Sequence, residues 1–156
     1  MPLLADEDVR YLQENFATLA HDVTITVVTR EKSRLVLPGA APGEDDAHDA
    51  SEEVKQIATE LAATSPRLKL AHVDAAADEA RARELAGERL PAIVFSSEMA
   101  RGKLRYFGLP AGYEMSTMVT AVLDLGGAEP PLPAEIGERL GQLARDVHIQ
   151  VFVTPS

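Results

Sequence analysis

Apolar residues recur along this chain at two alternating periods, one helical and one extended. Residues 6–20 have the helical period, and residues 23–29 (VTITVVT) alternate, with every second side chain on one face. Residues 51–64 return to the helical period. Asp49 and Glu52 have the spacing of a capping box, so a helix N-terminus is expected beside them.

The pattern continues to residue 127 with three further strands and two helices. In chain order these are a strand at 68–73, a helix at 78–86, strands at 90–97 and 104–108, and a helix at 112–127. The last two strands are joined by the short turn EMARGK and are expected to form a hairpin. Residues 35–50 (LVLPGAAPGEDDAHDA) are rich in proline, glycine and acid, and predict a long loop.

This order of elements is typical of an α/β protein with a thioredoxin-like fold (βαβαββα), in which the helix at 6–20 is an N-terminal addition. Pro91 stands immediately before a buried strand, where thioredoxin-like folds place a cis-proline. We therefore expect the Leu90–Pro91 peptide bond to be cis. The alternative is a trans proline that only begins a strand.

The end of the chain repeats its beginning. HDVTITVVT and DVHIQVFVT share the pattern Asp-Val-x-Ile-x-Val, and the apolar residues before them match at the same separation. The matched pairs are Leu12 with Ile136, Phe16 with Leu140, Leu19 with Leu143, and Val23 with Val147. Such a repeat indicates a duplicated structural unit. We expect one domain at residues 1–130, followed at 131–156 by the first helix and strand of a second, truncated unit.

The composition is that of an acidic globular chain. Its 156 residues are 46% hydrophobic and carry a formal net charge of −10, which suits one domain with an ordinary core. Nucleic acids and anionic membranes require clustered Lys and Arg, so neither is expected as a partner. No stretch approaches the roughly 18 apolar residues of a membrane span, and MPLLADEDVR does not resemble a leader. A cytoplasmic location is expected.

The possible chemistry is restricted most by a missing residue type. The chain contains no cysteine, which excludes disulfides, thiolate metal sites and thiol catalysis within these residues. A Ser-His-Asp order with a nucleophile elbow is also missing, as is a phosphate-cradling glycine loop. The sequence therefore predicts no catalytic residue and no cofactor site.

The acidic loop offers one arrangement of metal-ligand types. Carboxylates and an imidazole lie close together there, and these groups bind divalent cations. The residues are Asp45, Asp46, His48 and Asp49. An acidic stretch before a helix is more often solvated and favourable to the helix dipole. We therefore expect no metal site.

Three stretches of the sequence resemble a known family. They are RLPAIVF, LRYFGLPAGYEMSTMVTAVLDLGG and DVHIQVFVTPS. Together they resemble the glutaredoxin-like protein disulfide oxidoreductases, made of two fused thioredoxin folds, and more loosely the N-terminal tandem-thioredoxin region of the alkyl hydroperoxide reductase flavoprotein subunit. The resemblance covers nearly the whole chain, and its most distinctive part is the turn at 106–112. It implies that the final strand opens a second unit and that Cys-x-x-Cys would be expected after Ser156.

The chain departs from this family after its first strand. The disulfide oxidoreductases carry Cys-x-x-Cys there, whereas this sequence has REKSRLVLPGAAPGEDDAHD. A serine hydroxyl cannot replace a thiolate in thiol–disulfide exchange, so Ser33 and Arg34 receive no catalytic role by position. Together with Leu90 and Pro91, they mark a candidate groove.

The sequence thus favours a redox-inactive thioredoxin-fold domain, the structural or docking partner of a thiol–disulfide oxidoreductase or a peroxide-detoxifying reductase. The resemblance implies a role in redox homeostasis. The alternative is a stand-alone, non-catalytic module that binds a protein or peptide near Pro91. An enzyme of another chemistry ranks last, because no convergent set of histidine and acidic residues is visible.

The apolar tail predicts a further contact. Val147, Ile149, Val151 and Val153 fall on one face of the expected strand. Leaving this face in water costs about 25 cal/mol per Å² of apolar area, and an unpaired strand invites edge pairing. We expect residues 146–154 to pair with the same segment of a second chain in a two-fold dimer, or else to dock onto their own domain.

Overall fold

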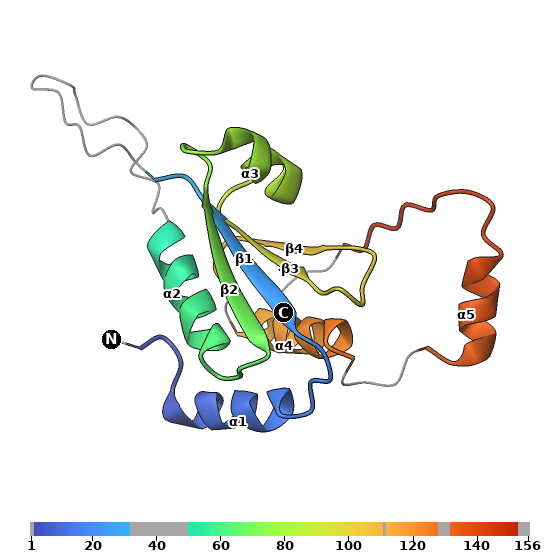
Figure 1. Ribbon diagram of the computed structural model, residues 1–156, viewed down its shortest axis with the longest axis horizontal. Coiled ribbons are helices and arrows are strands. Elements are labelled where there is room, and N and C mark those ends of the chain that lie inside the picture. Colours follow the sequence, from blue (N-terminus) through green and yellow to red (C-terminus); the bar gives the residue numbers. More distant parts are fainter. Residues whose placement is uncertain (1, 32–49, 111, 128–131, 153–156) are drawn as a thin grey trace, which may run out of the picture.

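A mixed β-sheet forms the centre of the computed structural model, which describes residues 2–31, 50–110, 112–127 and 132–152 (Figure 1). The strands are β1 (Val23–Thr29), β2 (Leu68–Asp74), β3 (Ala92–Ser96) and β4 (Leu104–Phe107). Their order in the sheet is β2-β1-β3-β4. β1 and β2 are parallel, whereas β3 runs antiparallel to both β1 and β4. The predicted hairpin is therefore present at the β3–β4 edge.

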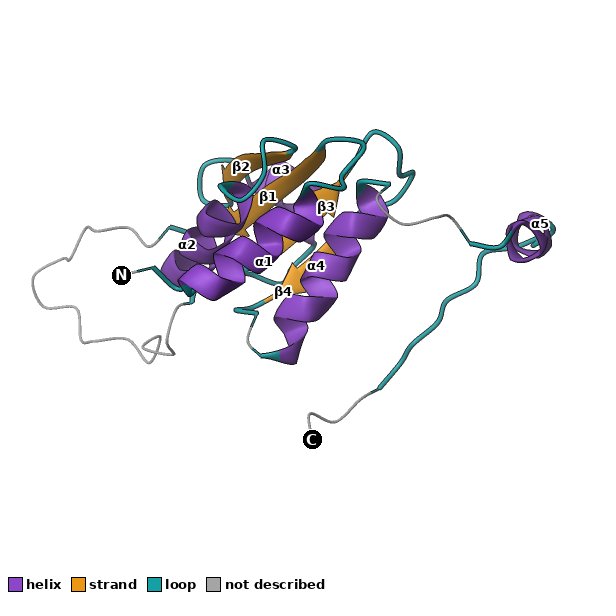
Figure 2. Ribbon diagram, turned by 90° about the horizontal axis from the view of Figure 1, so that it is seen from below, coloured by secondary structure: helices purple, strands orange, loops and turns teal. Residues whose placement is uncertain are grey.

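The helices cover both faces of this sheet. They are α1 (Asp6–Phe16), α2 (Ser51–Ala62), α3 (Glu79–Ala86), α4 (Tyr113–Leu125) and α5 (Ala134–Gly141). α1, α2 and α4 pack on one face and α3 packs on the other, whereas α5 stands away from the sheet (Figure 2). This order of elements agrees with the hydrophobic pattern up to residue 127.

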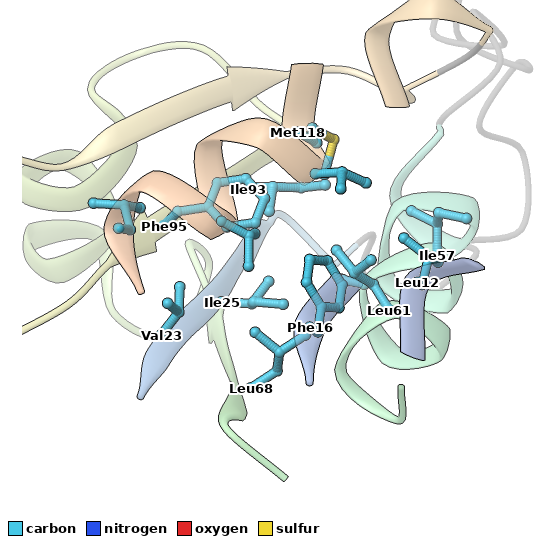
Figure 3. Packing of buried hydrophobic residues seen from close by; sticks show 14 of the residues in the cluster. Leu12, Phe16, Val23, Ile25, Ile57, Leu61, Leu68, Ile93, Phe95 and Met118 are labelled. Carbon is cyan, nitrogen blue, oxygen red and sulfur yellow. The ribbon is translucent and has the colours of Figure 1, made fainter. Parts of the chain in front are cut away.

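The larger hydrophobic core lies between the sheet and the helices α1, α2 and α4 (Figure 3). The alternation of β1 directs Val23, Ile25 and Val27 into it, because successive side chains of a strand point to opposite faces. Phe16 of α1 and Phe95 of β3 are each 1% exposed in this core. The additional helix α1 is therefore an integral part of the domain.

A smaller core lies beneath α3. Val28 of β1 and Val94 of β3 face this side of the sheet. The helix presents small residues, Ala82 and Ala86, together with Leu85. Short side chains let the α3 backbone approach the sheet, so the two faces of the sheet carry helices of different bulk.

Two predicted helices end earlier than their apolar pattern suggests. α1 ends at Phe16 because the next residues turn toward α4, where the backbone N–H groups of Ala20 and His21 both donate to the Gly126 carbonyl at 3.0 Å. α2 ends at residue 62 and begins after Ala50, which makes no side-chain cap. The expected capping role of Asp49 falls on a residue outside the described ranges.

The predicted strand at the end of the chain is not formed. Residues 146–152 have no strand partner, and the described residues 132–152 are all exposed. An isolated strand has no internal hydrogen bonds, so without a neighbouring edge it does not persist. Docking of this tail onto its own domain is also not observed among these residues. Pairing with a second chain stays a prediction.

Candidate functional site

The candidate groove lies at the end of the sheet where β1 and β2 finish and β3 begins. In the sheet register, Pro91 and Asp74 flank Thr29, the last residue of β1. The Leu90–Pro91 peptide bond is cis, the conformation expected from the sequence. The Pro91 carbonyl accepts a hydrogen bond of 3.0 Å from the Gly108 N–H just beyond β4. The start of β3 is therefore anchored to the hairpin.

Asp74 organises the backbone around this end of the sheet. Its carboxylate accepts hydrogen bonds from the N–H groups of Ala76 at 2.9 Å and Glu31 at 3.1 Å. These two bonds favour the ionised form and hold the pKa of Asp74 below its usual value. The side chain thus ties the end of β1 to the turn that follows β2.

Lys55 connects the end of β1 to the first part of α2. Its ammonium lies 3.2 Å from the Glu31 carboxylate and 3.1 Å from that of Glu52. Burial lowers the pKa of Lys55, but the hydrogen bonds to Glu52 and Glu31 outweigh it and raise that pKa above its usual value. Residues on the two sides of the segment 32–49 are therefore held together by an ion pair.

The same end of the sheet contains a hydroxyl–imidazole pair that the sequence did not reveal. Thr29 Oγ1 and His72 Nε2 are hydrogen-bonded at 2.8 Å. A hydroxyl beside an imidazole can serve as a nucleophile, but Thr29 is 1% exposed and no substrate can reach it. The pair therefore satisfies a buried polar group. The parallel β1–β2 register is the signal that brings the two residues together.

A hollow of about 210 Å³ adjoins Leu90 at this end of the molecule. Charged residues of both signs line it, namely Arg30, Glu79, Arg83 and Glu88. Arg83 and Glu79 approach to 4.0 Å. Such a lining favours a charged or polar group over an apolar one. The other two predicted groove residues, Ser33 and Arg34, lie outside the described residues.

The turn between β4 and α4 is held by Tyr106. Its hydroxyl donates a short hydrogen bond to the Glu114 carboxylate at the start of α4. Burial and this carboxylate together raise the pKa of Tyr106 well above its usual value. The segment that carries the most distinctive sequence resemblance is thus a structural link between the hairpin and the last helix of the sheet layer.

A larger hollow of about 520 Å³ lies between α1 and α4, and we call it the α1–α4 groove. Its apolar lining includes Leu3, Leu4, Leu12, Ile57, Met115 and Val119. The hydrophobic pattern did not predict this groove, because it forms only when α1 packs beside α4.

No group of three or more metal-ligand side chains is found in the part of the chain that the structure describes. The acidic candidates Asp45, Asp46, His48 and Asp49 lie outside those residues. Within the described ranges, none of the helices is long and apolar enough to cross a membrane.

Comparison with known proteins assigns the fold. No protein-family model matches the chain. The NTD_N/C domain of alkylhydroperoxide reductase AhpF from Enterococcus faecalis (V583) matches 88% of this chain and 59% of its own chain, with a TM-score of 0.66 and 22% identity. A protein disulfide oxidoreductase from Aeropyrum pernix K1 matches 89% of this chain and 55% of its own, with a TM-score of 0.68 and 23% identity. The chain has a thioredoxin-like fold.

Sequence relatives of this thioredoxin-like chain agree with the structural ones. The corresponding alkyl hydroperoxide reductase component of Staphylococcus aureus (strain MRSA252) is 26% identical over 106 residues. These residues make up 68% of this chain but only 18% of that protein. Both relatives named by the sequence resemblance, the hydroperoxide reductase and the disulfide oxidoreductase, are therefore found. The chain spans under a fifth of the curated relative's length.

Proposed function

We propose that this chain is a redox-inactive thioredoxin-fold domain that serves as the structural or docking partner of a thiol–disulfide oxidoreductase or a peroxide-detoxifying reductase. The observation that carries the proposal is a thioredoxin-like fold in a chain without cysteine. Thiol–disulfide exchange requires a thiolate, and no other side chain of the chain supplies one. A role in redox homeostasis and a cytoplasmic location are part of the proposal.

The geometry of the sheet end supports a non-catalytic role. Asp74 and Lys55 are engaged in holding the backbone and the start of α2, and the Thr29 hydroxyl is buried. Groups occupied in this way position the chain, and among the described residues they leave no accessible nucleophile beside Pro91. The relatives are named as reductase and oxidoreductase components, which favours a place in such a system.

An insulin-reduction assay tests the redox-inactive part. With dithiothreitol as reductant, the chain should give the same rate of turbidity increase as dithiothreitol alone. A thioredoxin domain carrying Cys-x-x-Cys is the positive control. A rate above the reductant-only background would contradict the proposal.

Calorimetric titration tests the docking part. The chain should bind a thioredoxin-fold domain that carries Cys-x-x-Cys, and the same titration with an unrelated acidic protein should give no heat. Absence of binding to the first domain would leave the chain without the proposed partner.

The second candidate is a stand-alone module that binds a protein or peptide near Pro91. The charged hollow beside Leu90 favours it, because that hollow offers Arg30 and Arg83 to an acidic side chain. An Arg83→Glu variant should then lose binding to an acidic peptide library, while Arg101→Glu, in the β3–β4 turn, should not. Equal binding by both variants would exclude this hollow as the binding site.

A further inference from the structure

The apolar stripe of α5 and the residues after it is exposed where its repeat counterpart is buried. In the first copy, Leu12, Phe16, Leu19 and Val23 are 2%, 1%, 5% and 0% exposed. In the second copy, Ile136, Leu140, Leu143 and Val147 are 45%, 50%, 55% and 57% exposed. The same spacing of side chains thus forms a core in one place and a bare surface in the other.

Such a surface is costly in water. Each fully buried Leu or Ile side chain contributes about 1.5–3 kcal/mol relative to an exposed one, and contiguous apolar patches mark interaction sites. In Figures 1 and 2, α5 stands away from the sheet, and its own domain does not cover it. The cover must therefore come from a surface that is itself apolar and unoccupied.

The α1–α4 groove is such a surface. Its floor is formed by Leu12, Ile57 and Val119, and its rim exposes Leu3 (46%) and Tyr11 (58%). α1 is the helix that α5 repeats, and it already packs beside α4 with the same apolar spacing. A helix of the α5 type is therefore the shape that this side of the domain accommodates.

Charge also favours a match between the two surfaces. The first turn of α1 is acidic, with Asp6, Glu7 and Asp8, and Asp8 lines the groove. Arg139 immediately precedes Leu140 on α5 and lies in the last turn of that helix. A guanidinium beside the apolar stripe can meet the acidic rim, which fixes the orientation of the docked helix.

We propose that α5 of one chain docks into the α1–α4 groove of a second copy, and that the second α5 occupies the first groove in return. A two-fold arrangement covers both stripes and both grooves at once. Doubling the contact brings the buried area toward the order of 1,200 Å² that a stable interface requires. The dimer expected from the sequence is retained, but its contact moves from the tail strand to α5. The proposal is independent of any oxidoreductase partner.

Cross-linking between engineered cysteines tests this contact directly, because the natural chain has no thiol to interfere. Chains carrying Tyr11→Cys are mixed with chains carrying Leu140→Cys, and a short bismaleimide is added. Both sites are exposed, so neither substitution removes a core residue. The expected product is a heterodimer of the two variants. A matched control replaces Tyr11→Cys with Met99→Cys, which is 65% exposed in the β3–β4 turn and should give background yield.

The double variant in a single chain distinguishes the two possible sources of α5. Cross-linking within one chain at low concentration, without dimers, would show that α5 folds back onto its own groove and would overturn the proposal. Equal yields from the Tyr11 and Met99 pairs would overturn it as well.

Sedimentation of two further variants provides an independent readout. Leu140→Asp should raise the dimer dissociation constant at least about tenfold, since it places a charge in the apolar contact, whereas Met99→Asp should not change it. Deletion of residues 145–156 should leave the dimer in place. A monomer after this deletion would return the contact to the tail strand, and a monomeric natural chain would refute the dimer altogether.

Discussion

Gly126, at the end of α4, packs directly on Leu19, which follows α1. A Cβ atom added to Gly126 would overlap Cδ2 of Leu19 and lie 3.2 Å from the Val122 carbonyl oxygen. The Gly126 carbonyl also receives the N–H groups of Ala20 and His21. This contact joins the additional helix α1 to the last helix of the sheet layer, so it holds the α1–α4 groove in shape.

Replacing Gly126 with alanine should therefore destabilise the domain. Leu19 is 5% exposed and must shift to admit the new methyl group, which costs about 1–3 kcal/mol in a packed core. Urea unfolding measures the change. Gly102→Ala is the matched control, because a Cβ there meets nothing within 4 Å. If Leu19→Ala does not relieve the effect of Gly126→Ala in a double-mutant cycle, the steric explanation is wrong.

Asp74 should make the stability of the domain depend on pH in acid. Its folded-state pKa is below the unfolded value of about 3.9, so its contribution is present above that value and is lost as the pH falls through the folded pKa. Asp74→Asn cannot titrate but can still accept the Glu31 and Ala76 N–H bonds. Urea midpoints at pH 6, 4 and 3 should fall less steeply for this variant than for the natural chain. Parallel slopes would contradict the role of Asp74.

Tyr106 should titrate at a higher pH than an exposed tyrosine. Its folded-state pKa is raised, so the stability that it contributes is complete below the unfolded value of about 10 and is lost as the pH rises through the folded pKa. Absorbance at alkaline pH follows the ionisation. Tyr106→Phe should remove the latest-titrating component, and Glu114→Gln should move that component to lower pH. A titration unchanged by Glu114→Gln would show that the carboxylate is not the cause.

The Thr29–His72 pair should respond asymmetrically to substitution. In His72→Leu the buried Thr29 hydroxyl loses its partner beneath an apolar side chain, and the expected cost is about 1–3 kcal/mol. Thr29→Val removes the hydroxyl itself and leaves the half-exposed edge of β2 free to meet water, so it should be close to neutral. The double variant should recover most of the loss. Equal costs for the two single variants would contradict this account.

Deletion of residues 132–156 should leave the thioredoxin-like domain folded. The described residues of this segment are exposed and none belongs to either core. Far-ultraviolet circular dichroism should lose only the signal of α5, and the thermal midpoint of the domain should not fall. A loss of cooperative unfolding would show that this segment stabilises the first domain.

The elements that the sequence predicted correctly are those that a local pattern specifies. Residues 23–29 alternate and form β1 with those bounds, and residues 113–125 have the helical period that ends at Gly126. Pro91 was recognised by its place before a buried strand. The absence of cysteine required no structure at all, and it decides the chemistry that the chain can perform.

The tertiary structure decided what no local pattern contains. The parallel register of β1 and β2 brings Thr29 beside His72, and the turn toward Gly126 ends α1 at Phe16 although the apolar spacing continues. The end of the chain shows the physical reason most clearly. The helical half of the second copy forms as α5, because a helix makes its backbone hydrogen bonds within itself. The strand half stays unpaired, because a strand requires the edge of another segment, and its own sequence cannot provide one.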